Sequence, residues 1–184
     1  MRITKVTTKT GDKGKTALGD GSRVKKDSLR VHCLGSIDEL NSSIGLASVM
    51  LPVKPIIDLK SVQNDLLNIG AEISMPGSKK KFLNKDRILF LEKEIESINK
   101  DLPPLEEFIL PGGNDLCSRV HMARSICRRA ERDLVSLNRS SNIITINFNL
   151  TVKSFEKINL LNDKIINLYP TSDITIGRDQ NISL

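Results

Sequence analysis

The chain is poor in aromatic residues: it has no Trp, one Tyr and five Phe among 184 residues. Proteins that bind single-stranded nucleic acid without sequence preference stack the bases on exposed rings, so this composition disfavours that mode of binding. The three cysteines, Cys33, Cys117 and Cys127, form no CxxC pair. We therefore expect reduced thiols that fill small apolar spaces, rather than disulfides or zinc ligands.

Long apolar stretches are also absent. No run of about 18 apolar residues occurs, so the sequence predicts no membrane-spanning helix. The first ten residues, MRITKVTTKT, lack the apolar core of a signal peptide, and we expect a cytoplasmic protein. The length and the apolar fraction of 39% suffice for a single domain with its own core, which we place over residues 1–184.

Positive charge is what the chain has in excess. Lys and Arg number 28 against 22 Asp and Glu, which gives a net charge of +6. A surplus of this size suits either a nucleic acid or a small polyphosphate as partner.

Helical periodicity dominates the chain from about residue 28 onward. Apolar residues spaced three and four apart predict helices over 28–51, 55–75, 84–102 and 114–137. A fifth helix is expected over 155–168, although the β-branched stretch at 143–152 could form a short strand. The sequence thus predicts an all-α bundle of five helices over 28–168, preceded by a loop at 1–27 and followed by a loose tail at 169–184.

The expected fourth helix has a continuous apolar seam and two charged flanks. Its apolar residues alternate in spacing between four and three: Leu116, Val120, Ala123, Cys127, Ala130, Leu134 and Leu137. Successive residues of a helix are turned by about 100° around its axis. This rotation places Cys117, His121, Arg124, Arg128 and Glu131 on one flank beside the seam, with Arg132 just beyond. Arg119, Arg129 and Asp133 fall on the far side, where we expect solvated groups.

Two interpretations of the first flank stay open. Arg128 and Glu131 can form an ordinary i, i+3 pair on a solvated surface, worth about 0.2–0.5 kcal/mol. Alternatively, Arg124 and Arg128, one turn apart, can form an anion site or a subunit contact, because guanidinium groups suit phosphate oxygens. His121 has no partner at metal-ligand spacing, which favours a structural role for it.

The segment TKTGDKGKT, Thr8 to Thr16, cannot help to build a core. It ends in Gly-Lys-Thr, as a Walker A loop does, but Lys9 stands where that pattern requires its first glycine. What remains is either a solvated arm or a flexible loop whose amides, lysines and hydroxyls wrap an anion.

Five stretches occur in an order that resembles the PduO-type corrinoid adenosyltransferase family: TKTGDKGKT, DGSRVKKDSLRV, GSIDELNSSIGLA, FILPGG and HMARSICRRAERDLV. The resemblance implies a ferritin-like up-and-down helical bundle. It also implies transfer of the 5′-deoxyadenosyl group of ATP to cob(I)alamin, with Mg²⁺ and with release of triphosphate. The expected assembly is a homotrimer with active sites between subunits. A flavin reductase and an acceptor enzyme for adenosylcobalamin are the implied protein partners.

The resemblance also implies roles for individual residues. Asp38 would pair with Arg124 of a neighbouring subunit near the corrinoid, and Phe108 would pack under the corrin ring. Arg128, Glu131 and Arg132 would complete the ATP site. The loop that wraps the triphosphate would use Thr8, Lys9, Thr10, Gly11, Asp12, Lys13, Gly14 and Thr16, with Lys26 adding a charge.

One part of the chain departs from the family pattern. The family has an Asn-Arg-Leu-Ser-Asp motif on its last helix, and the nearest match here is NLLND, Asn159 to Asp163. Asn159 is therefore the expected contact to ATP, with leucine following it where the family has arginine.

Two further hypotheses compete with the enzyme. An ATP-dependent adenosylcobalamin carrier or regulator would bind the same ligands without turnover. A helical nucleic-acid-binding protein would show steeply salt-dependent binding that ATP does not change. The joint match of the loop and the arginine-rich helix favours the enzyme.

Overall fold

The computed structural model describes residues 9–51, 58–84, 86–100, 102–104 and 109–141. Within them lie four helices and a two-stranded sheet. The expected strand at 143–152, the fifth helix at 155–168 and the tail at 169–184 are outside the described residues. No helix in the described part is long and apolar enough to cross a membrane.

The first two helices form where the periodicity predicts them. Helix α1 spans Leu29–Ser48 and helix α2 spans Leu59–Ser74. Asp58 caps α2, because its side chain accepts a hydrogen bond from the Ser61 backbone N–H at 3.1 Å. The buried apolar residues of the two helices keep the predicted spacing: Cys33, Ile37, Leu40, Ile44 and Ala47 on α1, and Leu59, Val62, Leu66, Ile69 and Ile73 on α2.

Helix α4 spans Asp115–Ser141 and has the predicted seam. Asn114 caps it by accepting a hydrogen bond from the Cys117 backbone N–H at 2.8 Å. Every predicted seam residue is buried except Val120, which is half-buried. Helix α3, Asp86–Asn99, has no buried residue, and Arg87 ties it to α2 through the carboxylate of Asp65 at 2.8 Å.

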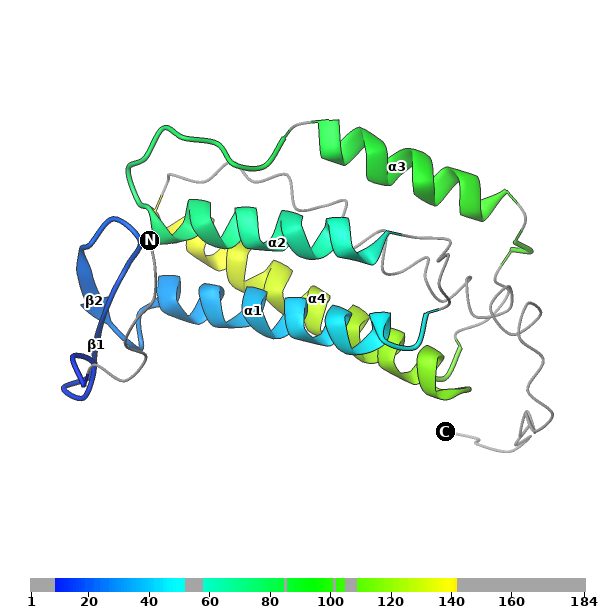
Figure 1. Cartoon of the computed structure of the whole chain (residues 1–184), viewed down its shortest axis with the longest axis horizontal. Coiled ribbons are helices and arrows are strands. Elements are labelled where there is room, and N and C mark those ends of the chain that lie inside the picture. The colour runs from blue at the N-terminus through cyan, green and yellow to red at the C-terminus, as the bar shows by residue number, and fades with distance from the viewer. Residues whose placement is uncertain (1–8, 52–57, 85, 101, 105–108, 142–184) are drawn as a thin grey trace.

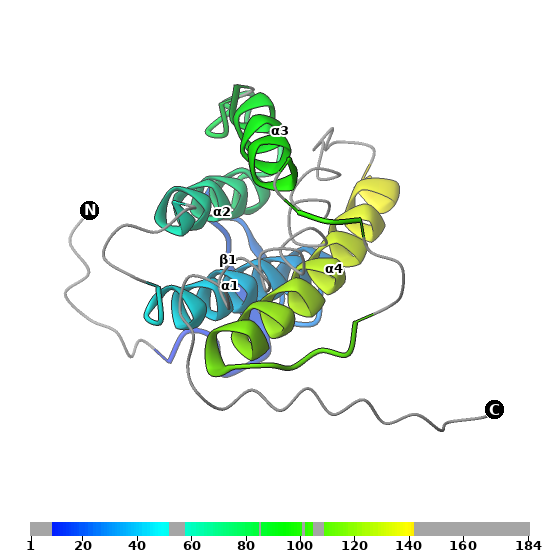
Figure 2. The same ribbon diagram turned by 90° about the vertical axis from the view of Figure 1, so that its right-hand side faces the viewer.

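Helix α1 lies between α2 and α4 and packs against both (Figure 1, Figure 2). The buried side chains of these three helices form one hydrophobic core. Helix α4 runs antiparallel to α1, since Cys33 contacts Asp133 while Glu39, further along α1, pairs with Arg129, earlier on α4. The C-terminal half of α4 therefore lies along the first half of α1.

The sheet is a correction to the expected loop at 1–27 and to a wholly α-helical fold. Strand β1, Lys15–Ala17, pairs antiparallel with β2, Arg23–Lys25. The connecting turn is closed by Asp20, whose Oδ1 accepts hydrogen bonds from the Ser22 backbone N–H and hydroxyl group at 2.9 and 2.6 Å. These strands could not be predicted, because the three-residue segments KTA and RVK are too short for an alternating apolar pattern.

The hairpin is docked on the bundle end where α1 begins and α2 ends (Figure 1). The Gly19 backbone N–H donates to the Ser74 carbonyl at 2.8 Å, and Leu18 is buried. From α1, the Arg30 guanidinium donates to the Ile73 carbonyl at 2.7 Å, so it occupies a carbonyl of the last turn of α2. These contacts fix the position of the N-terminal loop relative to the helices.

Candidate functional site

The N-terminal loop, residues 9–14, is shaped by backbone hydrogen bonds and by two left-handed residues. The Gly14 N–H donates to the Gly11 carbonyl at 3.1 Å, and the Asp12 N–H donates to the Lys9 carbonyl at 3.4 Å. Lys9 and Gly14 have φ angles of 56° and 74°. A Cβ on Gly14 would meet nothing within 4 Å, so glycine is needed there for its backbone conformation and not for space.

Lys26 lies directly against this loop. Its backbone N–H donates to the Gly14 carbonyl at 2.9 Å. Its Nζ is 3.1 Å from the place that a Cβ on Gly11 would occupy. The structure therefore places the ammonium group of Lys26 beside the loop to which the family resemblance assigns it.

The arginine-bearing flank of α4 lies level with the middle of α1, because Arg129 pairs with Glu39. Arg128 and Glu131 are half-buried and Arg132 is exposed. The Arg132 Nη1 donates to the Arg128 carbonyl at 3.1 Å, so its side chain folds back along the helix. Three of the predicted ATP-site residues therefore lie together within one turn of α4.

The far side of α4 differs from the prediction of solvated groups. Arg129 forms an ion pair with Glu39, and Asp133 accepts a hydrogen bond from the Ser36 hydroxyl group at 2.5 Å. The Cys33 thiol donates to the Asp133 carbonyl at 3.0 Å. Because α1 packs along this side of α4, the charges face a neighbouring helix, which a wheel of α4 alone does not include. Arg119 pairs with Asp115 within α4.

The opposite flank carries buried polar groups. His121 is 4% exposed, and its Nδ1 has no hydrogen-bond partner among the described residues. Burial, and secondarily the charge of Arg124, lowers the pKa of the His121 imidazole. The Nε of Arg124 is also buried without a partner in the same part of the chain. No cluster of three metal-ligating side chains occurs there, and His121 has the environment of a neutral, structural histidine.

Several predicted site residues are not brought together by the described chain. Asp38 is exposed on α1 and has no ion-pair partner among the described residues. Arg124 is half-buried and likewise lacks one there. Thr8, Phe108 and Asn159 lie outside the described residues.

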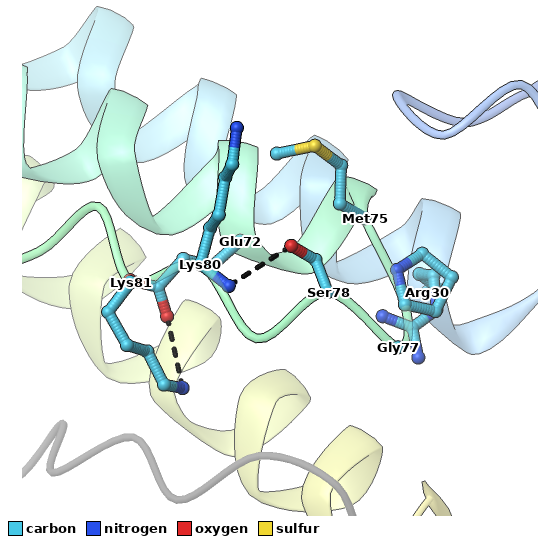
Figure 3. Close-up of a pocket in the computed structure, with 8 residues that line it drawn as sticks. Arg30, Glu72, Met75, Gly77, Ser78, Lys80 and Lys81 are labelled. Atoms are coloured by element: carbon cyan, nitrogen blue, oxygen red, sulfur yellow. Dashed lines mark hydrogen bonds and ion pairs between the residues drawn. The ribbon is translucent and has the colours of Figure 1, made fainter.

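A small basic pocket adjoins the hairpin at the end of α2 (Figure 3). Arg30, Lys80 and Lys81 supply its cations. Its one carboxylate, Glu72, is already used: it accepts hydrogen bonds from the Phe82 and Leu83 backbone N–H groups at 2.7 and 3.0 Å. None of the predicted site residues lines this pocket, so we treat it as separate from the candidate site.

Comparison with known proteins identifies the class. The cobalamin adenosyltransferase family model matches residues 6–166. The chain is 46% identical to the cobalamin adenosyltransferase of Cupriavidus metallidurans over 138 residues, 74% of each protein. It is 43% identical to the corrinoid adenosyltransferase of Bacillus subtilis over 145 residues, 76% of this chain and 75% of that protein.

A solved structure agrees with these relatives. A variant of the PduO-type ATP:corrinoid adenosyltransferase from Lactobacillus reuteri, complexed with cobalamin and ATP, superposes with a TM-score of 0.79 at 30% identity. The match covers 89% of this chain and 96% of that one. The chain belongs to the cobalamin adenosyltransferase family, and among its members it is similar to the PduO-type enzymes.

Proposed function

We propose that this protein transfers the 5′-deoxyadenosyl group of ATP to the cobalt of cob(I)alamin, forming adenosylcobalamin and releasing triphosphate. Family membership supports the reaction class. The observation that carries the site assignment is that Lys26 lies against the N-terminal loop, with its ammonium group at Gly11. The arginines of α4 join this site through the family resemblance.

The chemistry explains why no protein nucleophile is needed. Cob(I)alamin is itself a strong nucleophile, so the protein has to orient two substrates and stabilise the charge of the leaving group. The triphosphate leaves with several negative charges, and donors fixed before the reaction stabilise it without further reorganisation. Lys9, Lys13 and Lys26 on the loop side and Arg128 and Arg132 on α4 supply these donors.

Magnesium would enter with ATP. Mg²⁺ keeps several water molecules and is usually held by one or two carboxylates together with substrate phosphates. Asp12 is the one carboxylate between Lys9 and Lys15, and it is exposed. We assign it as the protein contact of the metal, which would neutralise part of the triphosphate charge.

The corrinoid would bind at a contact between subunits. By the family resemblance, Asp38 would pair with Arg124 of a neighbouring copy in a homotrimer, and Asp38 is exposed on α1, as such a contact requires. Phe108 would pack under the corrin ring and Asn159 would contact ATP from a fifth helix. A flavin reductase and an adenosylcobalamin-dependent enzyme are the expected protein partners.

Arg128→Ala tests the proposal directly. Removing a fixed charge donor from a leaving-group site costs on the order of 100-fold in rate, so we expect about that loss in kcat/KM with chemically reduced cobalamin. Product is followed by the absorbance of adenosylcobalamin and by release of triphosphate. Arg119→Ala, near the N-terminal end of the same helix, removes an equal charge and its pair with Asp115, and should retain activity.

Three outcomes would change the proposal. Wild-type protein that makes no adenosylcobalamin would refute the enzyme. Bound adenosylcobalamin passed to an acceptor without triphosphate release would indicate a carrier instead. Full activity in Arg128→Ala would refute the site assignment and leave the reaction class standing.

A further inference from the structure

The guanidinium of Arg23 spans the N-terminal loop. Arg23 is the first residue of β2, and the strand register places it opposite Ala17. Its Nη2 donates to the Thr10 carbonyl at 2.7 Å and, over a longer distance of 3.4 Å, to the Lys15 carbonyl. One side chain therefore joins the start of the loop to the strand that follows it.

These hydrogen bonds act on the part of the chain that would hold an anion. Thr10 and Lys15 enclose Gly11 to Gly14, the residues whose turn brings the loop against Lys26. A loop that binds phosphate through its N–H groups needs its carbonyl oxygens satisfied elsewhere, since those oxygens repel the same anion. Arg23 satisfies one of them, that of Thr10, and the first carbonyl of β1 with a charged donor, the stronger kind of hydrogen-bond donor.

The segment made up of β2 and the residue after it thus supplies two cations, Arg23 and Lys26, that make different contacts. Lys26, just after β2, lies against the loop with its ammonium group near Gly11. Both hydrogens of the Arg23 Nη2 point to protein carbonyls. A sequence search for phosphate-binding residues treats the two alike, because the distinction depends on the hairpin that folds β2 back on the loop.

We propose that Arg23 is a positioning residue for ATP: it holds residues 10–15 in the conformation that accepts the triphosphate. The proposal rests on the proposed function of the loop. If so, binding of ATP depends on the forked shape of the Arg23 guanidinium as well as on its charge.

The test compares Arg23→Lys, which keeps the charge but lacks the fork, with Arg23→Gln, which loses both. Lys25→Gln is the matched control, because Lys25 is also exposed and is two residues away on the same face of β2. We expect both Arg23 variants to raise the KM for ATP by about tenfold, about 1.4 kcal/mol, with kcat and the KM for cobalamin little changed. Lys25→Gln should change the KM for ATP less than twofold.

A second measurement does not depend on activity. In the protein without ATP, amide hydrogen exchange in residues 10–15 should become faster in Arg23→Lys than in wild type, while exchange in α1 stays the same. If Arg23→Lys matches wild type in both measurements, the positioning role is refuted. If wild type fails to bind ATP but the exchange result holds, Arg23 still orders the loop and only the ATP function is refuted.

Discussion

At the scale of single residues, burial decides the chemistry of the thiols. All three cysteines are free and buried, as the sequence predicts. Burial raises the pKa of Cys33 to about 11 and that of Cys127 to about 12, with Asp133 and Glu131 adding to the respective shifts. The thiolate is the reactive form, so at neutral pH these residues act as small apolar side chains of the core.

His121 gives the molecule a stability term that depends on pH. Its pKa lies below the ordinary value of 6.5 in the folded protein, so the unfolded chain binds the proton more readily. Well above pH 6.5 His121 is neutral in both the folded and the unfolded protein, and it contributes no pH dependence to stability. As pH falls through 6.5 toward the lowered pKa, the free energy of unfolding should decrease by at most about 1.4 kcal/mol per pH unit.

Urea unfolding at pH 7.5 and 5.5 and fixed protein concentration measures this slope. His121→Gln should remove its part of the pH dependence. His32→Gln is the control, because His32 is the one other histidine of the chain and its side chain is 62% exposed. A slope that survives in His121→Gln and disappears in His32→Gln would contradict the assignment.

At the scale of elements, the docking of the hairpin depends on the absence of a side chain at Gly19. A Cβ there would be 2.6 Å from the Ser74 Oγ and 3.2 Å from the Met75 Cγ. Gly19→Ala should therefore weaken the contact between hairpin and α2 by about 1–3 kcal/mol. The expected result is faster amide exchange at position 19, by about tenfold or more, while the core of α1 keeps its protection.

Two further variants separate crowding from other effects of the substitution. Gly35→Ala adds the same methyl group at a position with nothing within 4 Å, and should leave the hairpin unchanged. Ser74→Ala removes the closest atom, so the double variant with Gly19→Ala should recover part of the protection. If the amide of residue 19 exchanges at the same rate in Gly19→Ala and wild type, the hairpin and α2 can move apart without loss of stability, and the prediction is wrong.

The helices were predictable from the sequence and the hairpin was not. Apolar spacing located α1, α2 and α4 to within a few residues, because each buries one continuous stripe. The hairpin has one buried anchor, Leu18, and depends on hydrogen bonds to α2 that are distant in sequence. The ion pair of Arg129 with Glu39 was missed for the same reason: it requires knowing which helix packs beside α4.

The candidate site divides in the same way. The motifs predict the loop and the α4 arginines as site residues, and the structure places Lys26 against the loop. Arg23 stands within a motif stretch, yet its contact with Thr10 is a property of the folded hairpin. No periodicity or spacing predicts a guanidinium that donates to a carbonyl thirteen residues earlier.

At the scale of the whole molecule, exposed apolar side chains near the C-terminal end of α1 and on the first half of α4 support self-association. Leu46 on α1 and Val49 and Met50 just after it are exposed, and Met122 on α4 is 61% exposed. Exposed apolar side chains on two packed helices are typical of a surface that another chain covers. A second copy that pairs Asp38 with Arg124 would cover both helices.

Charge exchange tests the assembly. We expect wild type to sediment as a trimer, and Asp38→Arg and Arg124→Asp each to shift the population toward monomer by placing like charges together. The double variant should restore trimer, because the pair is re-formed with reversed signs. Circular dichroism shows whether each variant remains helical. A monomeric wild type, or single variants that remain fully trimeric, would refute this contact.

The antiparallel course of α1 and α4 has a consequence for folding. The contact of Cys33 with Asp133 joins residues 100 apart, whereas Asn41 of α1 meets Gln63 of α2 over a separation of 22. Closing the longer loop costs roughly 1.3 kcal/mol more in chain entropy. The α1–α2 pair thus forms at the lower entropy cost, and the packing of α4 on α1 is completed only by the more remote contact.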